Sequence, residues 1–159
     1  MDPKALALRR LTLREYSSAE MMGYLRRKGV DEASARAVVS ELEERGLIDP
    51  ARYAAAIARS QIARGKGPLA VLAKLRRRGL SGDLSAARKL YESEGGGEAG
   101  ATAESVAIRQ VLAVRFPELD RKDEKAVYRA YQALLRRGFS PSAVREVLDS
   151  LSADSLHNL

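Results

Sequence analysis

The chain repeats one short pattern three times: an apolar and basic segment, a glycine, an apolar residue, a polar turn and a second amphipathic segment. The pattern reads YLRRKGVDEASARAVVSEL at 24–42, KLRRRGLSGDLSAARKLYES at 74–93 and LLRRGFSPSAVREVLDSL at 134–151. On a helical wheel, Leu25, Leu75 and Leu134 each share a largely apolar stripe with the residues three and four positions earlier. Glycine is the usual residue at a helix stop because it enters the left-handed conformation without steric cost. Each copy therefore predicts two helices that meet near its glycine.

Signals for helix starts support the same units. Ser17 is typical of the N-cap of a capping box in which Glu20 reaches back to it. Proline stands at the first helical position after Asp49, Gly67 and Ser140. A further helix is expected before each pair, at about 3–15, 50–64 and 102–116. The result is an all-α chain of nine helices in three tandem three-helix modules.

The modules are expected at residues 1–46, 47–94 and 102–152, with a glycine-rich linker at 95–101 and a polar tail at 153–159. Because repeats bury their cores between neighbours, we expect an elongated, curved helical array, with a compact bundle as the alternative. The stretch EGGGEAGA at 94–101 has the composition of a flexible linker, about which the third module would pivot.

The amino-acid composition favours helices and excludes several classes of site. Aromatic residues make up 5% of the chain and tryptophan is absent, so residues that favour strands are scarce. The absence of cysteine excludes disulfides and thiolate metal sites and fits a reducing compartment. No apolar run approaches the ~20 residues of a membrane span, and the first residues lack a signal-peptide core. A cytoplasmic protein without membrane contact is the expectation.

The residues of common catalytic sites are missing. His157 is the only histidine, so a Ser-His-Asp triad, a Cys-His pair and a zinc shell have no candidates. The stretch RGKGP at 64–68 lacks the spacing of a phosphate-binding P-loop and follows no predicted strand, so an interhelical turn is the better interpretation. We expect no catalytic residue, no cofactor, no metal and no enzymatic activity.

Positive charge is concentrated in the first two-thirds of the chain. The net charge is +7, and residues 1–93 hold 19 Lys and Arg against 11 Asp and Glu, whereas residues 94–159 hold 9 against 10. A field of this sign draws polyanions or an acidic protein surface. Because aromatic residues for base stacking are missing near the densest basic run, sequence-specific reading of nucleic acid is not implied.

The basic residues of the repeats fall into two sets. Arg27, Arg77 and Arg136 point away from the apolar stripe, whereas Lys28, Arg78 and Arg137 lie beside it at the helix C-terminus, where cations offset the helix dipole. A solvated face is the alternative for the outward set. Around the second repeat, Arg64, Lys66, Lys74 and Arg76 add positive charge to that of Arg77 and Arg78. The candidate partner-binding residues from the basic pattern are Arg27, Arg64, Lys66, Lys74, Arg76, Arg77, Arg78 and Arg136.

Four segments, taken in order, resemble the RecX family of bacterial regulators. They are LRRKGV at 25–30, GLIDPARYA at 46–54, GKGPLAVLAKLRRRGL at 65–80 and DEKAVYRAYQALLRRGFSPSAVREVL at 123–148. The family pattern G-Y-x-D-D-x-R-F-A is met through Gly46, Asp49, Arg52 and Ala54, with Pro50 in place of the second acidic residue and Tyr53 in place of phenylalanine. Arg52 thereby joins the candidate partner-binding residues.

The resemblance implies three tandem three-helix modules and a non-catalytic regulator. It implies that the protein lies in the helical groove of the RecA recombinase filament on single-stranded DNA, inhibits ATP hydrolysis and strand exchange, and so modulates recombination, DNA repair and the SOS response. Its basic residues would meet acidic filament surfaces or contact DNA directly, and a monomer is expected. The alternative is a stand-alone basic helical module that binds DNA or RNA without a RecA partner.

Overall fold

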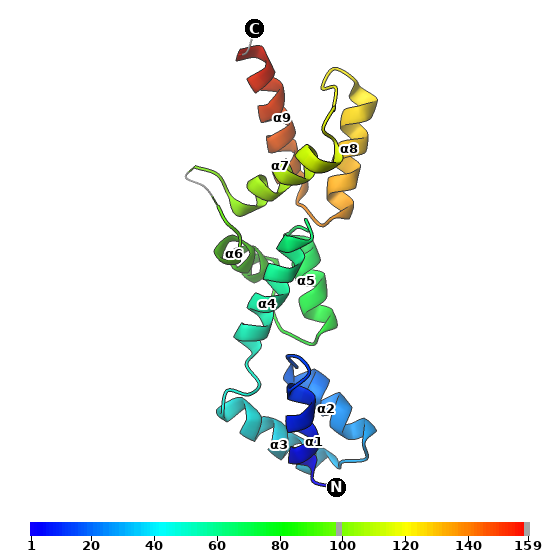
Figure 1. Cartoon of the computed structure of the whole chain (residues 1–159), viewed down its shortest axis with the longest axis vertical. Helices are drawn as coiled ribbons and strands as arrows, with labels where there is room; N and C mark the ends of the chain where they lie inside the picture. Colours follow the sequence, from blue (N-terminus) through cyan, green and yellow to red (C-terminus); the bar gives the residue numbers. More distant parts are fainter. Residues whose placement is uncertain (98–99, 158–159) are drawn as a thin grey trace. The chain divides into compact units, whose positions relative to one another are not determined.

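The computed structural model describes residues 1–97 and 100–157, with side chains described as far as residue 151. Within these residues the chain forms nine α-helices and no strand (Figure 1), which confirms the all-helical prediction. The helices are α1 (Pro3–Leu11), α2 (Ser18–Arg27), α3 (Glu32–Glu44), α4 (Pro50–Ala63), α5 (Pro68–Arg77), α6 (Leu84–Glu94), α7 (Ala103–Arg115), α8 (Glu124–Arg136) and α9 (Pro141–His157).

Short polar side chains cap most of the helix starts. The side chain of the residue before the helix accepts a hydrogen bond from an amide two or three residues further on, which satisfies one of the donors left free in the first turn. These capping residues are Asp2, Ser17, Asp31, Asp83, Thr102 and Asp123. Proline opens α1, α4, α5 and α9, where its missing amide proton costs nothing.

The repeated glycine ends α2, α5 and α8 in the same way. Gly29, Gly79 and Gly138 have φ angles of 85°, 73° and 90°. The amide of the next residue then donates to the carbonyl of the leucine four residues before the glycine. The N···O distances are 3.0 Å for Val30 to Leu25, 2.9 Å for Leu80 to Leu75 and 3.3 Å for Phe139 to Leu134. This is the long bond of a Schellman motif, so the repeated phrase encodes one helix stop used three times.

The first helix is shorter than the predicted segment 3–15. It ends at Leu11, and the hydroxyl of Thr12 donates to the carbonyl of Arg9 at 2.6 Å. A threonine hydroxyl that bonds back to the preceding turn competes with helix continuation. The chain therefore leaves the helix before Arg14, which becomes available for contacts with later helices.

The described chain divides into two compact units. The first unit contains Met1–Ala56 and Lys74–Ser81, and the second contains Ile57–Ala73 and the chain from Gly82 onward. Helices α4 and α5 thus contribute to both units. The module boundaries expected from the sequence follow helix order rather than this division, and they stay a prediction.

Each unit has its own apolar core. The core of the first unit is formed by Leu6, Ala7, Tyr16, Met21, Tyr24, Leu25, Ala35, Val39, Leu42 and Ile48. The largest fully buried side chains of the second unit include Val71, Tyr91, Ile108, Leu134, Phe139 and Val144. The reference leucines of the three repeats are all buried, as the wheel predicts.

Contacts join the helices on either side of the glycine-rich stretch. The carboxylate of Glu92 in α6 accepts from the amides of Ala103 at 2.7 Å and Glu104 at 3.3 Å, at the start of α7. A Cβ atom on Gly95 would lie 2.7 Å from the Cβ atom of Ala103. Residues 98–99 lie outside the described residues, and a pivot about 95–101 stays a prediction.

In the first unit, the C-terminal end of α5 lies against the N-terminal end of α2. The hydroxyl of Ser17 accepts from the amide of Glu20 at 3.1 Å and donates to the carbonyl of Arg78 at 2.5 Å. A Cβ atom on Gly79 would lie 2.7 Å from the Cβ atom of Ala19. One serine thus satisfies a free amide of α2 and a free carbonyl at the end of α5.

In the second unit, the C-terminal end of α8 meets the N-terminal end of α5 in a similar way. The amide of Gly67 donates to the carbonyl of Arg137 at 2.9 Å, and the amide of Leu69 donates to the carbonyl of Gly138 at 3.0 Å. A Cβ atom on Gly67 would lie 2.5 Å from the oxygen of Gly138, and one on Gly138 would lie 2.6 Å from the nitrogen of Ala70. Glycine on both sides allows the two backbones to bond directly.

We expect Gly138→Ala to destabilise the protein more than Gly29→Ala. Both glycines have positive φ, which costs an alanine about 1–2 kcal/mol. A Cβ atom on Gly29 meets nothing within 4 Å, whereas one on Gly138 overlaps Ala70, which adds about 1–3 kcal/mol of overpacking. Urea denaturation measures both values. Equal losses of unfolding free energy in the two variants would show that the contact between α8 and α5 contributes nothing.

Candidate partner-binding surface

The basic phrase of α5 presents two cations to solvent and turns the others partly inward. Arg76 and Arg77 are exposed, whereas Lys74 and Arg78 are half-buried, and Leu75 between them is buried. The prediction that Arg77 points outward and Arg78 lies nearer the apolar stripe holds for this helix, whereas Lys28, at the matching position of the first repeat, is exposed. Arg76 and Arg77 are the cations of α5 that a partner reaches most easily.

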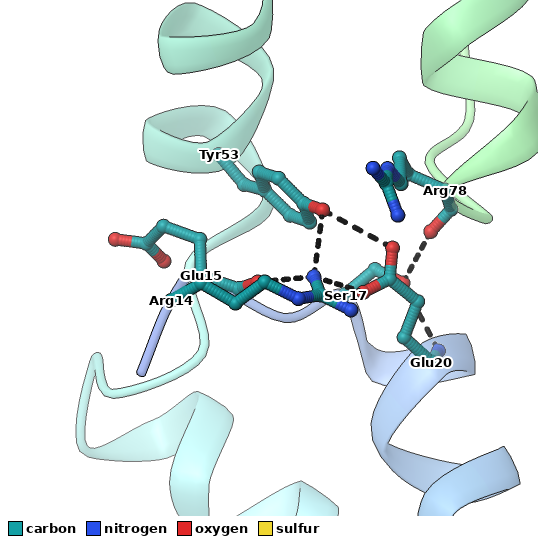
Figure 2. Close-up of polar contacts among 6 residues, drawn as sticks. All are labelled: Arg14, Glu15, Ser17, Glu20, Tyr53 and Arg78. Atoms are coloured by element: carbon teal, nitrogen blue, oxygen red, sulfur yellow. Dashed lines mark hydrogen bonds and ion pairs between the residues drawn. The ribbon is translucent and has the colours of Figure 1, made fainter. Parts of the chain in front are cut away.

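A polar network around Arg14 ties α4 to the segment before α2. Figure 2 shows the Arg14 guanidinium between the Glu20 carboxylate and the Tyr53 hydroxyl. Its Nη1 atom donates to Glu20 Oε2 at 2.7 Å, to the Tyr53 hydroxyl at 3.1 Å and to the carbonyl of Glu15 at 2.7 Å. The guanidinium also lies over the Tyr16 ring, 3.8 Å from its centroid. These contacts join three segments of the first unit at one side chain.

The role of Glu20 differs from the capping-box prediction. Ser17 caps α2 as expected, but the oxygens of Glu20 accept from Arg14 and from the Tyr53 hydroxyl, the latter at 3.2 Å. The Glu20 side chain is only 15% exposed. A hydrogen bond from a guanidinium stabilises a partly buried carboxylate more than one from a neutral amide does. Glu20 therefore bonds to Arg14 and not to the amide of Ser17.

The network shifts two pKa values. Burial lowers the pKa of Arg14, but the hydrogen bond and the charge of Glu20 outweigh it, so that the pKa is raised. The pKa of Tyr53 is raised by burial and, next in size, by the charge of Glu20, while the positive charges of Arg14 and Arg78 act in the opposite direction. Both groups therefore keep their protons at neutral pH, as the hydrogen bonds require.

Arg78 completes the same junction. Figure 2 shows its guanidinium on the side of Tyr53 and Glu20, while its carbonyl accepts from Ser17. The backbone of Arg78 therefore has a structural task, and its side chain adds positive charge beside the Arg14 network. Its role in partner binding stays a prediction.

Several hydrogen bonds tie the Arg52 side chain to other residues of the first unit. Its guanidinium donates to the Glu15 carboxylate at 2.7 and 3.2 Å, and to the carbonyls of Gly46 and Leu47 at 3.0 and 3.3 Å. The bond to Glu15 raises the pKa of Arg52. Gly46 and Arg52, two positions of the family pattern, are thus joined directly. Arg52 ties the loop before α4 to the segment before α2, and any contact with a partner stays a prediction.

The remaining predicted residues lie in both units. Arg27 is exposed in α2 of the first unit, whereas Arg64, Lys66 and Arg136 belong to the second unit. Lys66 is half-buried, and its carbonyl accepts from the hydroxyl of Tyr91 at 2.8 Å. Arg64 and Lys66 precede α5, whereas Arg76 and Arg77 belong to its last turn and Arg78 follows it. The cations grouped by the sequence therefore belong to different units, Arg64 and Lys66 to the second and Arg76 to Arg78 to the first.

The sequence alone does not predict the contact between Arg14 and Tyr53. The sequence predicts that Arg14 lies in the first helix, and the partners of Arg14 come from positions that no helical wheel relates. The one available signal was the replacement of phenylalanine by Tyr53 in the family pattern, because a hydroxyl added to an otherwise buried ring needs a polar partner.

The described residues contain neither a group of side chains suited to a metal ion nor a membrane-spanning helix. Among them, no group of three or more His, Cys, Asp or Glu side chains is placed to hold a metal ion. No helix among the same residues is long and apolar enough to cross a bilayer.

We expect Tyr53→Phe to lower the unfolding free energy by about 1 kcal/mol at neutral pH, because two hydrogen bonds of the hydroxyl are lost. Tyr128→Phe is the matched control, since Tyr128 is 62% exposed and, among the described residues, its hydroxyl accepts a hydrogen bond from Gln132 alone.

The same variant has a pH signature. The raised pKa of Tyr53 gives stabilisation that is fully present below the unfolded value of about 10 and is lost as the pH rises through the folded value. The unfolding free energy of the unmodified protein should therefore fall more steeply above pH 10 than that of Tyr53→Phe. Urea denaturation between pH 8 and 11 measures this difference, and parallel curves would contradict the assigned network.

Comparison with known proteins identifies the family. Three family models match the chain in order: the first three-helix domain of RecX at residues 4–42, the second at 49–87 and the third at 104–148. The regulatory protein RecX of Halorhodospira halophila is 32% identical over 148 residues, which cover 93% of this chain and 87% of the relative. The regulatory protein RecX of Acidithiobacillus ferrooxidans is 32% identical over 150 residues, covering 92% and 89%.

Solved structures show the same fold. The crystal structure of RecX from Lactobacillus salivarius superposes with a TM-score of 0.71 at 20% identity and covers 95% of both chains. A crystal structure of a regulatory protein RecX superposes with a TM-score of 0.62 at 21% identity, covering 93% of this chain and 74% of that one. The resemblance seen in the sequence and the three-module prediction are confirmed, and this chain belongs to the RecX family of regulatory proteins.

Proposed function

We propose that this protein binds the RecA recombinase filament on single-stranded DNA and inhibits its ATP hydrolysis and DNA strand exchange. The observation that carries the proposal is the match to all three RecX domains along one chain, with relatives that are regulatory proteins. The protein would thereby modulate recombination and DNA repair in the cytoplasm, where the filament forms.

Electrostatics supports an acidic partner. The chain carries a net charge of +7, and Arg76 and Arg77 lie exposed at the end of α5 in the first unit. Positive charge speeds encounter with acidic surfaces and with DNA phosphates. The proposed contact places these two arginines, with Arg27, against acidic side chains or phosphates in the groove of the filament.

The repeated modules suit a partner that is itself repeated. Contacts made by separate modules act together, because once one module is bound the others are held at a high effective concentration. Occupation of the groove blocks the path of a second DNA strand and restrains the subunit movements of ATP hydrolysis. No chemical step by the protein itself is needed, which agrees with a regulator that is not an enzyme.

We expect the protein to lower the rate of DNA-dependent ATP hydrolysis by RecA in a concentration-dependent manner. The double variant Arg76→Glu with Arg77→Glu should raise the concentration for half-inhibition at least about tenfold, which corresponds to about 1.4 kcal/mol of lost binding free energy. The matched control is Arg88→Glu with Lys89→Glu, an equal charge change at an exposed pair of α6. An unchanged ATPase rate at saturating protein contradicts the proposed function.

A stand-alone nucleic-acid-binding module is the second candidate, favoured by the net charge of +7. It predicts tight binding to naked DNA or RNA with a steep dependence on salt, and no preference for a RecA filament. Sedimentation of the protein with assembled filaments and with naked single-stranded DNA, at low salt and at about 0.5 M salt, separates the two functions. At this higher salt the screening length falls to a few ångströms, so purely electrostatic contacts are lost first.

A further inference from the structure

A groove of the second unit is lined by arginines and aliphatic side chains. It lies between the end of α4 with the following turn, the C-terminal half of α7, and the end of α8, and its volume is about 270 Å³. The cationic lining is Arg64, Arg115 and Arg137, and the aliphatic lining includes Ile62, Val111 and Val114. Arg64 was a candidate from the sequence, whereas Arg115 and Arg137 were not.

Positive charge in this groove is not balanced by acidic side chains. The described residues that line it include no Asp or Glu, and within the described chain none of the three arginines forms an ion pair. Burial lowers the pKa of Arg137, and the charge of Arg115 lowers it further. The folded chain thus holds like charges near one another, and an anion that entered the groove would relieve their repulsion.

The backbone fixes the position of Arg137. Its Nη1 atom donates to the carbonyls of Arg64 and Gly65 at 3.3 and 3.2 Å, and its own carbonyl accepts from Gly67. Gly65 has a φ of 69°, and a Cβ atom there would lie 3.2 Å from Val111 Cγ2 and 3.3 Å from Arg137 Nη1. The turn before α5 therefore packs directly on α7 and holds the guanidinium at the groove before any ligand arrives.

An aliphatic surface lies beside the cations. Val114 is 79% exposed, whereas Val111 one helical turn earlier is 7% exposed. A phosphodiester backbone offers no aliphatic group of matching size to this surface. A peptide that carries both aliphatic and carboxylate side chains matches both parts, and arginine beside apolar contacts is typical of the strongest points of protein interfaces.

We propose that this groove binds an acidic segment of a partner protein, with an aliphatic side chain against Val111 and Val114 and carboxylates on Arg64, Arg115 and Arg137. The identity of that partner rests on the proposed function, in which it is a subunit of the recombinase filament. The groove itself rests only on the geometry and charge of the second unit.

The test is a titration of the full chain followed by NMR of its methyl groups. One probe is a ten-residue peptide in which leucine alternates with glutamate, and the other is a ten-nucleotide oligothymidylate. We expect the peptide to shift the methyl signals of Val111 and Val114 and to leave those of Val38, in the first unit, unchanged. No shift with the peptide, or a shift at these valines with the oligonucleotide alone, overturns the proposal.

Two variants make the titration specific. Arg115→Glu should weaken peptide binding at least about tenfold. Arg129→Glu, an equal charge change at an exposed residue of α8, should leave it within about twofold. Val114→Ser changes an exposed side chain and should weaken binding about threefold while folding is retained. Equal losses of peptide affinity in Arg115→Glu and Arg129→Glu would mean that the peptide responds only to the net charge of the protein. That result would contradict binding in the groove.

The filament assay separates this inference from the proposed function. If the peptide binds at the two valines but the protein leaves RecA unaffected, the groove stands and the proposed function fails. If RecA is inhibited but the peptide causes no shift, the groove fails and the proposed function stands. If both hold, Arg115→Glu should also raise the concentration for half-inhibition, and Arg129→Glu should not.

Discussion

The pairing of helix ends is the constraint on which this structure depends. Every helix leaves amides free at its first turn and carbonyls free at its last, and burying them without partners costs free energy. In each unit the end of one helix supplies carbonyls to the start of another: Arg78 to Ser17 in the first, and Arg137 and Gly138 to Gly67 and Leu69 in the second. The opposite partial charges of the two helix ends attract each other at both places.

In the second and third repeats, this pairing explains why the phrase joins basic residues to a glycine. The glycine turns the chain so that the last carbonyls point out of the helix, and it allows the close approach seen at Gly79 and Gly138. Arg78 and Arg137, which stand just before these two glycines, are half-buried. Their positive charge lies beside the negative end of the helix. The arginine one position earlier is exposed in α5 and α8, and so remains available to a partner.

Two arginines of the first unit form ion pairs, whereas the arginines that line the groove of the second unit form none among the described residues. Arg14 is joined to Glu20, and Arg52 to Glu15, so these arginines hold α4 to the segment before α2. In the groove of the second unit, the described lining offers Arg64, Arg115 and Arg137 no carboxylate. The same residue type thus stabilises the fold in one place and, in our proposal, awaits a ligand in another. The presence or absence of a neighbouring carboxylate makes the difference.

The sequence by itself determined the helices, their stops and the three-module order. These features are local: a capping side chain, a proline at the first turn and a glycine after a leucine stripe act within a few residues, so one chain suffices to identify them. The partners of Glu20, the position of Arg14 beside Tyr53 and the arginine groove of the second unit were decided only by tertiary structure. Each depends on side chains that lie tens of residues apart in the sequence, and the distance between such groups follows from helix packing that no periodicity encodes.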